Sequence, residues 1–143
     1  MADRETASAV LDASALLAYL GTEPGADAVA DAIAAGAAIS TVNLAEALST
    51  LATRGADPTA VVTQLTDRGL LDGAITVETF TTTDATEAAR LRPLTRSAGL
   101  SLADRACLAL ARRLAREALT ADRAWLGLEL DAPRIRMVRE AAP

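Results

Sequence analysis

Residue types that carry much of enzyme chemistry are scarce or missing in this sequence. Its 143 residues include no histidine and one cysteine, Cys107, and since lysine is absent, all 14 basic residues are arginine. The lack of histidine and of a second cysteine excludes a disulfide framework, zinc fingers, histidine-based triads and Cys–His nucleophile pairs. The lack of lysine excludes a P-loop lysine and Schiff-base chemistry. Any chemistry must therefore use carboxylates, hydroxyls or arginines.

Other shortages narrow the class of protein. Aromatic residues make up 2% of the chain, too few for base stacking along a single-stranded nucleic acid. No apolar run is long enough to predict a transmembrane helix, and residues 1–8 lack the features of a secretory signal. We therefore expect a cytoplasmic protein with no membrane partner. With 51% hydrophobic and 23% charged residues, the chain predicts one globular domain over residues 1–143.

Short apolar runs alternate along the chain with stretches of helical periodicity. Strands are predicted at 7–11, 37–40, 75–78, 118–120 and 134–138, where Val, Ile and Thr are frequent. Helices are predicted at 13–20, 26–35 and 43–54. Three more are predicted from their capping residues: one from Asp57 to near 68, one from Asp84 to near 96, and one from Ser101 to near 116. This alternation predicts an α/β fold with a central parallel sheet of four to five strands flanked by helices.

Two aspartates stand where predicted strands end and helices begin. Asp12 interrupts an apolar run after the first strand, and Asp122 follows the fourth. Ligand sites of parallel sheets form outside the carboxyl ends of the strands, and a buried charge needs a metal, an arginine or helix-start N–H groups as a partner. The alternative is that each aspartate only caps the helix that follows it.

Two further acids lie on predicted helices. Asp104 shares an apolar stripe with Cys107, which we expect to be a core residue, and forms a possible capping box with Ser101. Glu46 follows Asn43 with the spacing of another capping box, and helical spacing alone favours a solvated face for it.

Four acids in such positions can converge on one pocket at the edge of the sheet. Carboxylate oxygens are the ligands that Mg²⁺ and Mn²⁺ prefer. Because the chain has no histidine, we expect water activated by one or two such ions to be the nucleophile.

Four segments resemble the four acidic blocks of PIN-domain nucleases, and more narrowly the VapC-type toxins of bacterial toxin–antitoxin pairs. They are 10–18, 40–46, 99–111 and 119–125, in the order and spacing of that family. The resemblance implies an acidic metal site and two supporting hydroxyls. The implied metal ligands and catalytic residues are Asp12, Glu46, Asp104 and Asp122, and the supporting residues are Ser14 and Thr120.

The same resemblance implies an activity and partners. It implies a PIN-like fold and an endoribonuclease that depends on Mg²⁺ or Mn²⁺ and cuts transfer RNA or ribosomal RNA. It also implies a homodimer that a cognate, VapB-like antitoxin holds inactive. Two alternatives remain: a PIN nuclease of RNA processing without an antitoxin, and a catalytically inert PIN-like module that only binds a partner.

Arginines near one predicted helix are candidates for binding RNA. Arg105, Arg112 and Arg116 fall on one helical stripe, and Arg113 is adjacent. Arginines there can contact phosphates, although a solvated helix face is the commoner fate of such residues. The helices over 26–35 and 43–68 are rich in alanine and leucine, which predicts either a groove for an antitoxin or dimer partner, or ordinary core packing.

Overall fold

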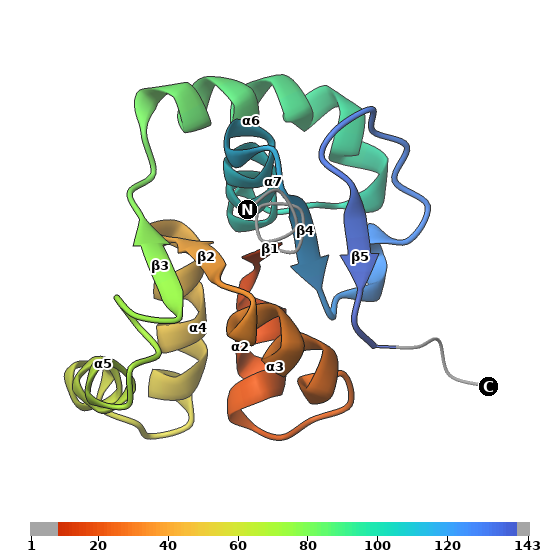
Figure 1. Cartoon of the computed structure of the whole chain (residues 1–143). Helices are drawn as coiled ribbons and strands as arrows, with labels where there is room; N and C mark the ends of the chain where they lie inside the picture. Colours follow the sequence, from red (N-terminus) through yellow and green to blue (C-terminus); the bar gives the residue numbers. More distant parts are fainter. Residues whose placement is uncertain (1–8, 140–143) are drawn as a thin grey trace.

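A parallel sheet of five strands forms the centre of the computed structural model, which describes residues 9–139 (Figure 1). The strands are β1 (Ala9–Leu11), β2 (Ala37–Ser40), β3 (Ile75–Glu78), β4 (Glu117–Thr120) and β5 (Ile135–Met137). Their order is β3-β2-β1-β4-β5, and every neighbouring pair is parallel. The predicted α/β fold is confirmed, while residues 7 and 8 of the first predicted strand lie outside the described residues.

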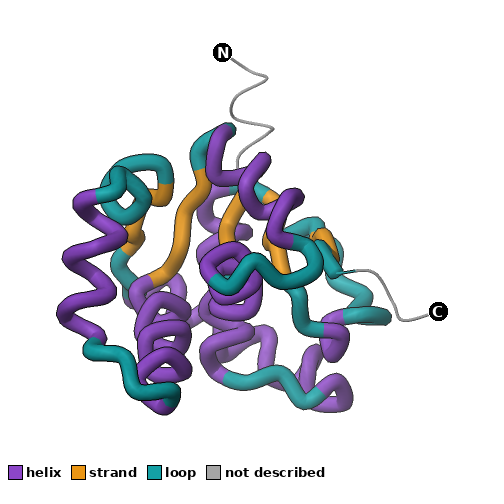
Figure 2. The backbone as a smooth tube through the Cα atoms, turned by 90° about the horizontal axis from the view of Figure 1, so that it is seen from below, coloured by secondary structure: helices purple, strands orange, loops and turns teal. Residues whose placement is uncertain are grey.

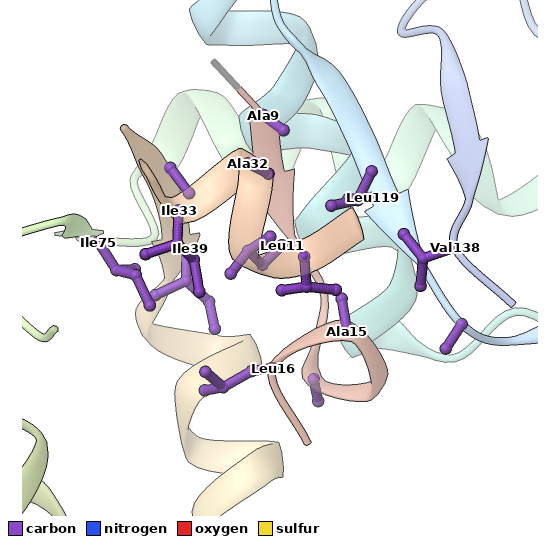
Figure 3. Packing of buried hydrophobic residues seen from close by; sticks show 14 of the residues in the cluster. Ala9, Leu11, Ala15, Leu16, Ala32, Ile33, Ile39, Ile75, Leu119 and Val138 are labelled. Carbon is purple, nitrogen blue, oxygen red and sulfur yellow. The ribbon is translucent and has the colours of Figure 1, made fainter. Parts of the chain in front are cut away.

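Helices cover both faces of the sheet, because successive strand residues point to opposite sides. Leu11 joins a cluster with residues of α2 (Ala13–Leu20), α3 (Ala26–Ala34) and α4 (Thr41–Thr53) (Figure 3). Its neighbour Val10 joins a second cluster, with residues of α6 (Thr82–Thr95), α7 (Leu102–Leu114) and Trp125. A further helix, α5 (Pro58–Asp67), packs on α4. Figure 2 shows the strands as one row flanked by helices.

Two helices begin earlier than their sequence spacing predicts. The Ser40 hydroxyl accepts the hydrogen bond of the Val42 N–H and caps α4, so the predicted cap Asn43 lies inside the first turn. Thr81 caps α6, and Asp84 is the third residue of its capping box rather than the cap. In both cases a Ser or Thr directly before the helix satisfies the first N–H groups.

The order of the strands locates the site. The chain passes from β1 through β2 to the edge strand β3, and then returns to place β4 on the other side of β1. In sheets with such a reversal, ligands usually bind outside the carboxyl ends of the two strands where the order reverses, here β1 and β4. The Asp12 N–H donates to the Leu119 carbonyl oxygen at 3.1 Å, so the two strand ends lie side by side there.

Between residues 9 and 139, none of the helices has the length and apolar character needed to cross a membrane.

Candidate active site

Asp12 is the buried centre of the site. It follows β1 directly, caps α2, and is 2% exposed. Its Oδ1 accepts hydrogen bonds from the Ser14 hydroxyl at 2.7 Å and from the Ala15 N–H at 2.8 Å. Its Oδ2 accepts one from the Thr120 hydroxyl at 2.5 Å. The carboxylate is therefore a helix cap and also a firmly oriented group at the carboxyl ends of β1 and β4.

The two hydroxyls are themselves oriented by backbone amides. Ser14 Oγ accepts from the Ala121 N–H at 2.9 Å, and Thr120 Oγ1 accepts from the Asp122 N–H at 3.0 Å. Each hydroxyl has a single proton, and with an N–H on one side that proton is directed to Asp12. The end of β4 thus sets the orientation of the carboxylate that follows β1.

Burial raises the pKa of Asp12 from 3.8 to about 6. Hydrogen bonds from Thr120, Ser14 and the Ala15 N–H oppose this rise, and the negative charge of Asp104 adds to it. An ionised carboxylate with few waters and a like charge nearby is costly. A cation beside it would relieve that cost.

Glu46 approaches the same edge from α4. Its side chain is half-buried rather than fully solvated, in contrast to the face that helical spacing favours. Burial raises its pKa, and the charges of Asp104 and then Asp122 raise it further. Because such repulsion weakens with distance, the three carboxylates share one region at the carboxyl edge of the sheet.

Asp104 and Asp122 are each held by one oxygen. Asp104 Oδ2 accepts from the Ser101 N–H at 2.9 Å in the capping box of α7, and Asp122 Oδ1 accepts from the Ala124 N–H at 2.9 Å. Within residues 9–139, the second oxygen of each carboxylate has no hydrogen-bond donor. These two oxygens are therefore available to a ligand.

The donor chemistry of the site fits a hard divalent cation. Across the described part of the chain, no three acidic or thiol side chains are already gathered closely enough to hold a metal ion. The four acids nevertheless offer only oxygen, which suits Mg²⁺ or Mn²⁺. The nearby thiol of Cys107 is buried, and burial together with the charges of Asp12 and Asp104 raises its pKa well above the usual value, so it remains a protonated core group.

Asn43 is a polar residue of the site region that sequence analysis assigned to a helix cap. It is 0% exposed, and its Nδ2 donates to the Ala103 carbonyl oxygen at 2.9 Å. This bond joins α4, one turn before Glu46, to α7, one residue before Asp104. Its Oδ1 is buried and has no hydrogen-bond partner among residues 9–139. The signal that could have identified it is Ser40, a better cap three residues earlier.

Three of the four predicted RNA-binding arginines hold α7 against α6 instead of forming an open stripe. Arg105 Nη1 donates to the Ala88 carbonyl oxygen at 2.9 Å, and Arg112 pairs with Glu87 at 3.1 Å. Arg113 makes two hydrogen bonds to Asp84, at 2.7 and 3.1 Å.

The fourth arginine, Arg116, lies far from the acids. Helix α7 ends at Leu114, short of the predicted end near 116, and Arg116 directly precedes β4. It therefore belongs to the opposite, amino edge of the sheet, where it is half-buried.

Comparison with known families agrees with this fold. The PIN domain matches residues 9–128, so the chain belongs to the PIN-domain family. A comparison with curated protein sequences found no match.

Solved structures with the same fold come from bacterial toxin–antitoxin systems. A toxin–antitoxin complex from Klebsiella pneumoniae is 18% identical with a TM-score of 0.66, and covers 94% of this chain and 100% of its own. A DNA-bound VapBC from Salmonella typhimurium is 15% identical with a TM-score of 0.65, and covers 92% and 98%. FitAcB from Neisseria gonorrhoeae is 19% identical with a TM-score of 0.60, and covers 80% and 87%. At these identities the likeness is one of fold.

Proposed function

We propose that this chain is a Mg²⁺- or Mn²⁺-dependent endoribonuclease that acts as the toxin of a toxin–antitoxin pair. The observation that carries the proposal is the buried carboxylate of Asp12, which three hydrogen bonds orient at the edge of the sheet. Family membership supports a nuclease. The fold of the toxin–antitoxin complexes supports the toxin role.

The four acids Asp12, Glu46, Asp104 and Asp122 are the proposed metal ligands. When bound, a divalent ion supplies the Lewis acidity that activates water and neutralises charge at a phosphodiester. Asp12 contributes a fixed anion, since Ser14 and Thr120 hold both of its oxygens. Asp104 and Asp122 contribute the oxygens that their caps do not use.

The hydrogen-bond network keeps Asp12 in its ionised form at neutral pH. Burial raises its pKa to about 6, so below that pH it holds a proton that must leave before the carboxylate can bind a cation. Three donated hydrogen bonds favour the charged form and limit this rise. We infer that Ser14 and Thr120 are supporting residues for this reason.

We further propose a VapB-like antitoxin and a homodimer as partners, and transfer or ribosomal RNA as the substrate. The similar structures from Klebsiella pneumoniae and Salmonella typhimurium are a toxin–antitoxin complex and a DNA-bound VapBC, which supports the first partner. A cavity of about 490 Å³ beside α3, lined by Tyr19, Ala30 and Leu70 among others, is a candidate position for an apolar partner segment.

Cleavage of RNA by the purified chain tests this function. Total RNA is incubated with wild type, Asp104→Asn and the matched control Asp31→Asn, whose carboxylate is exposed on α3, in Mg²⁺, Mn²⁺ or EDTA. We expect cleavage by wild type and by the control, and none in EDTA or with Asp104→Asn. Cleavage that survives both would refute the metal–carboxylate mechanism.

The cleavage assay, together with expression of the chain in cells, separates the alternatives. The absence of cleavage in either metal would favour an inert PIN-like binding module. Cleavage without growth arrest on expression, or growth arrest that no neighbouring small gene relieves, would favour a nuclease of RNA processing.

A further inference from the structure

A cavity lined by arginines lies at the amino edge of the sheet, opposite the acidic site. Its volume is about 400 Å³, and its lining includes Arg112, Arg116, Arg134, Glu117 and Pro133. Arg112 and Arg116 come from the end of α7 and the turn after it, while Arg134 directly precedes β5. Residues from two separate parts of the chain therefore direct positive charge at one hollow.

The arginines of this cavity are not neutralised equally. Arg112 pairs with Glu87 at 3.1 Å, and Glu117 pairs with Arg136 at 3.6 Å. Within residues 9–139, the side chains of Arg116 and Arg134 have no ion-pair partner. Because the one acid in the cavity wall already has a cation, two guanidinium groups remain uncompensated.

The charges around the cavity differ between its two sides, and only the side at Arg116 and Arg134 favours an anion. The hollow next to Arg112 carries Glu129 and Asp131, so negative charge gathers there. On the other side Arg116 also lines a second cavity of about 580 Å³, formed mainly by the end of α3 and the turns before β2 and β3. The uncompensated charge is thus centred on Arg116 and Arg134.

We propose that this arginine cavity binds phosphate groups of the RNA substrate, an inference that rests on the proposed function. A guanidinium presents donors in a planar fork that matches two phosphate oxygens. The protein carries a net charge of −5, and its acids repel RNA at the carboxyl edge. A structured RNA that reaches the acids from the far side of the domain would be held by Arg116 and Arg134.

The distance between the two sites has a consequence for substrate choice. About 15 Å of helix separates Asp104 from the end of α7 at Leu114, Arg116 lies two residues further on, and the two edges of the sheet face apart. An RNA that contacts both sites must extend along the domain from one edge of the sheet to the other. Because phosphate contacts carry no base information, the arginine cavity adds affinity for such an RNA without selecting its base sequence.

Binding of a labelled hairpin RNA in EDTA tests this inference without cleavage. Fluorescence anisotropy over a range of salt compares wild type, Arg116→Gln/Arg134→Gln and the control Arg54→Gln/Arg68→Gln, which removes the same charge elsewhere. Each lost phosphate contact lowers the slope of log affinity against log salt by roughly 0.7–0.9. We expect a slope lower by about 1.5 for the first double variant and no change for the control.

Equal effects of the two double variants, no effect of either, or no RNA binding by wild type would each overturn the inference. Binding of inorganic phosphate at this cavity that leaves the affinity for RNA unchanged would overturn the inference as well, and would indicate a small-anion site. In Mn²⁺ we expect Arg116→Gln/Arg134→Gln to raise KM with kcat unchanged. Because binding is read in EDTA, a failure of the nuclease proposal appears separately, as the absence of cleavage.

Discussion

Replacing Asp12 with asparagine should stabilise the fold while it removes activity. Asp12 is 2% exposed, and burial raises its pKa from 3.8 to about 6. Folding therefore favours the protonated, neutral form of this side chain. Asparagine is a neutral group of almost the same shape, so it avoids the cost of an ionised carboxylate at neutral pH.

The size of the effect follows from the pKa. The rise from 3.8 to about 6 corresponds to about 3 kcal/mol, at about 1.4 kcal/mol per pKa unit. The amide oxygen of the asparagine still accepts from the Ser14 hydroxyl and the Ala15 N–H, but its NH₂ group faces Thr120. The Thr120 hydroxyl can then rotate and donate to Ser14 Oγ, 3.2 Å away. This rearrangement costs about 1 kcal/mol. The net gain is about 2 kcal/mol, or about 4–8 °C in Tm for a chain of this size.

The sign of the pH dependence gives the sharpest test. A raised folded-state pKa contributes stability that is complete below pH 3.8 and is lost as pH rises through about 6. Asp12→Asn should thus match wild type near pH 4 and exceed it above pH 6, in thermal unfolding with EDTA present. Asp31→Asn, on an exposed carboxylate, should show no such gap. A destabilised Asp12→Asn at pH 8, or a gap that does not depend on pH, would refute this reasoning.

Three further predictions concern the supports of the site. Asn43→Ala removes the hydrogen bond from a fully buried amide to the Ala103 carbonyl oxygen, so we expect a loss of about 1 kcal/mol and weaker Mn²⁺ binding by calorimetry. The control Thr95→Val, equally buried on α6, should change stability alone. Arg113→Ala removes the cation that pairs with Asp84, which is 1% exposed. Unfolding by urea should show a free energy of unfolding lower by about 3 kcal/mol. The additional change Asp84→Asn should recover much of this loss. The affinity for Mn²⁺ should fall as pH drops through about 6, because the raised pKa of Asp12 lets protons compete with the metal. Titration by electron paramagnetic resonance measures this affinity, and a flat profile between pH 5 and 8 would contradict the prediction.

The local signals of the sequence predicted the fold well. The strands β2 to β5 agree with the predicted ranges to within one residue at each end, and Asp57 and Ser101 cap helices as predicted. These predictions succeed because apolar runs and capping side chains act over a few residues. The two misplaced caps, at Asn43 and Asp84, share a cause. Several polar residues stand near each helix start, and only the end of the preceding strand or loop decides which of them meets the first N–H groups.

Tertiary partners explain what spacing could not predict. The stripe that contains Arg105 and Arg112 was identified correctly as one face of a helix. Nothing in the sequence of α7 indicates that α6 lies along that face with Glu87 and the carbonyl of Ala88 facing it. The half-buried position of Glu46 has the same origin, since its neighbours Asp104 and Asp122 come from other elements.

The choice between helix cap and ligand, which the sequence leaves open for each aspartate, is not a choice between exclusive roles. A cap needs one carboxylate oxygen, and in Asp104 and Asp122 it uses one and leaves the other without a donor within the described residues. The capping bond also stops rotation of the carboxylate, which lowers the entropy lost when a cation binds. The N-terminal ends of α2 and α7 further stabilise negative charge by their dipoles, so acids that repel one another can stay ionised at one edge of the sheet. The helix starts of this fold thus supply both the position and the electrostatic support of the proposed all-carboxylate site, in a chain without histidine or lysine to provide another.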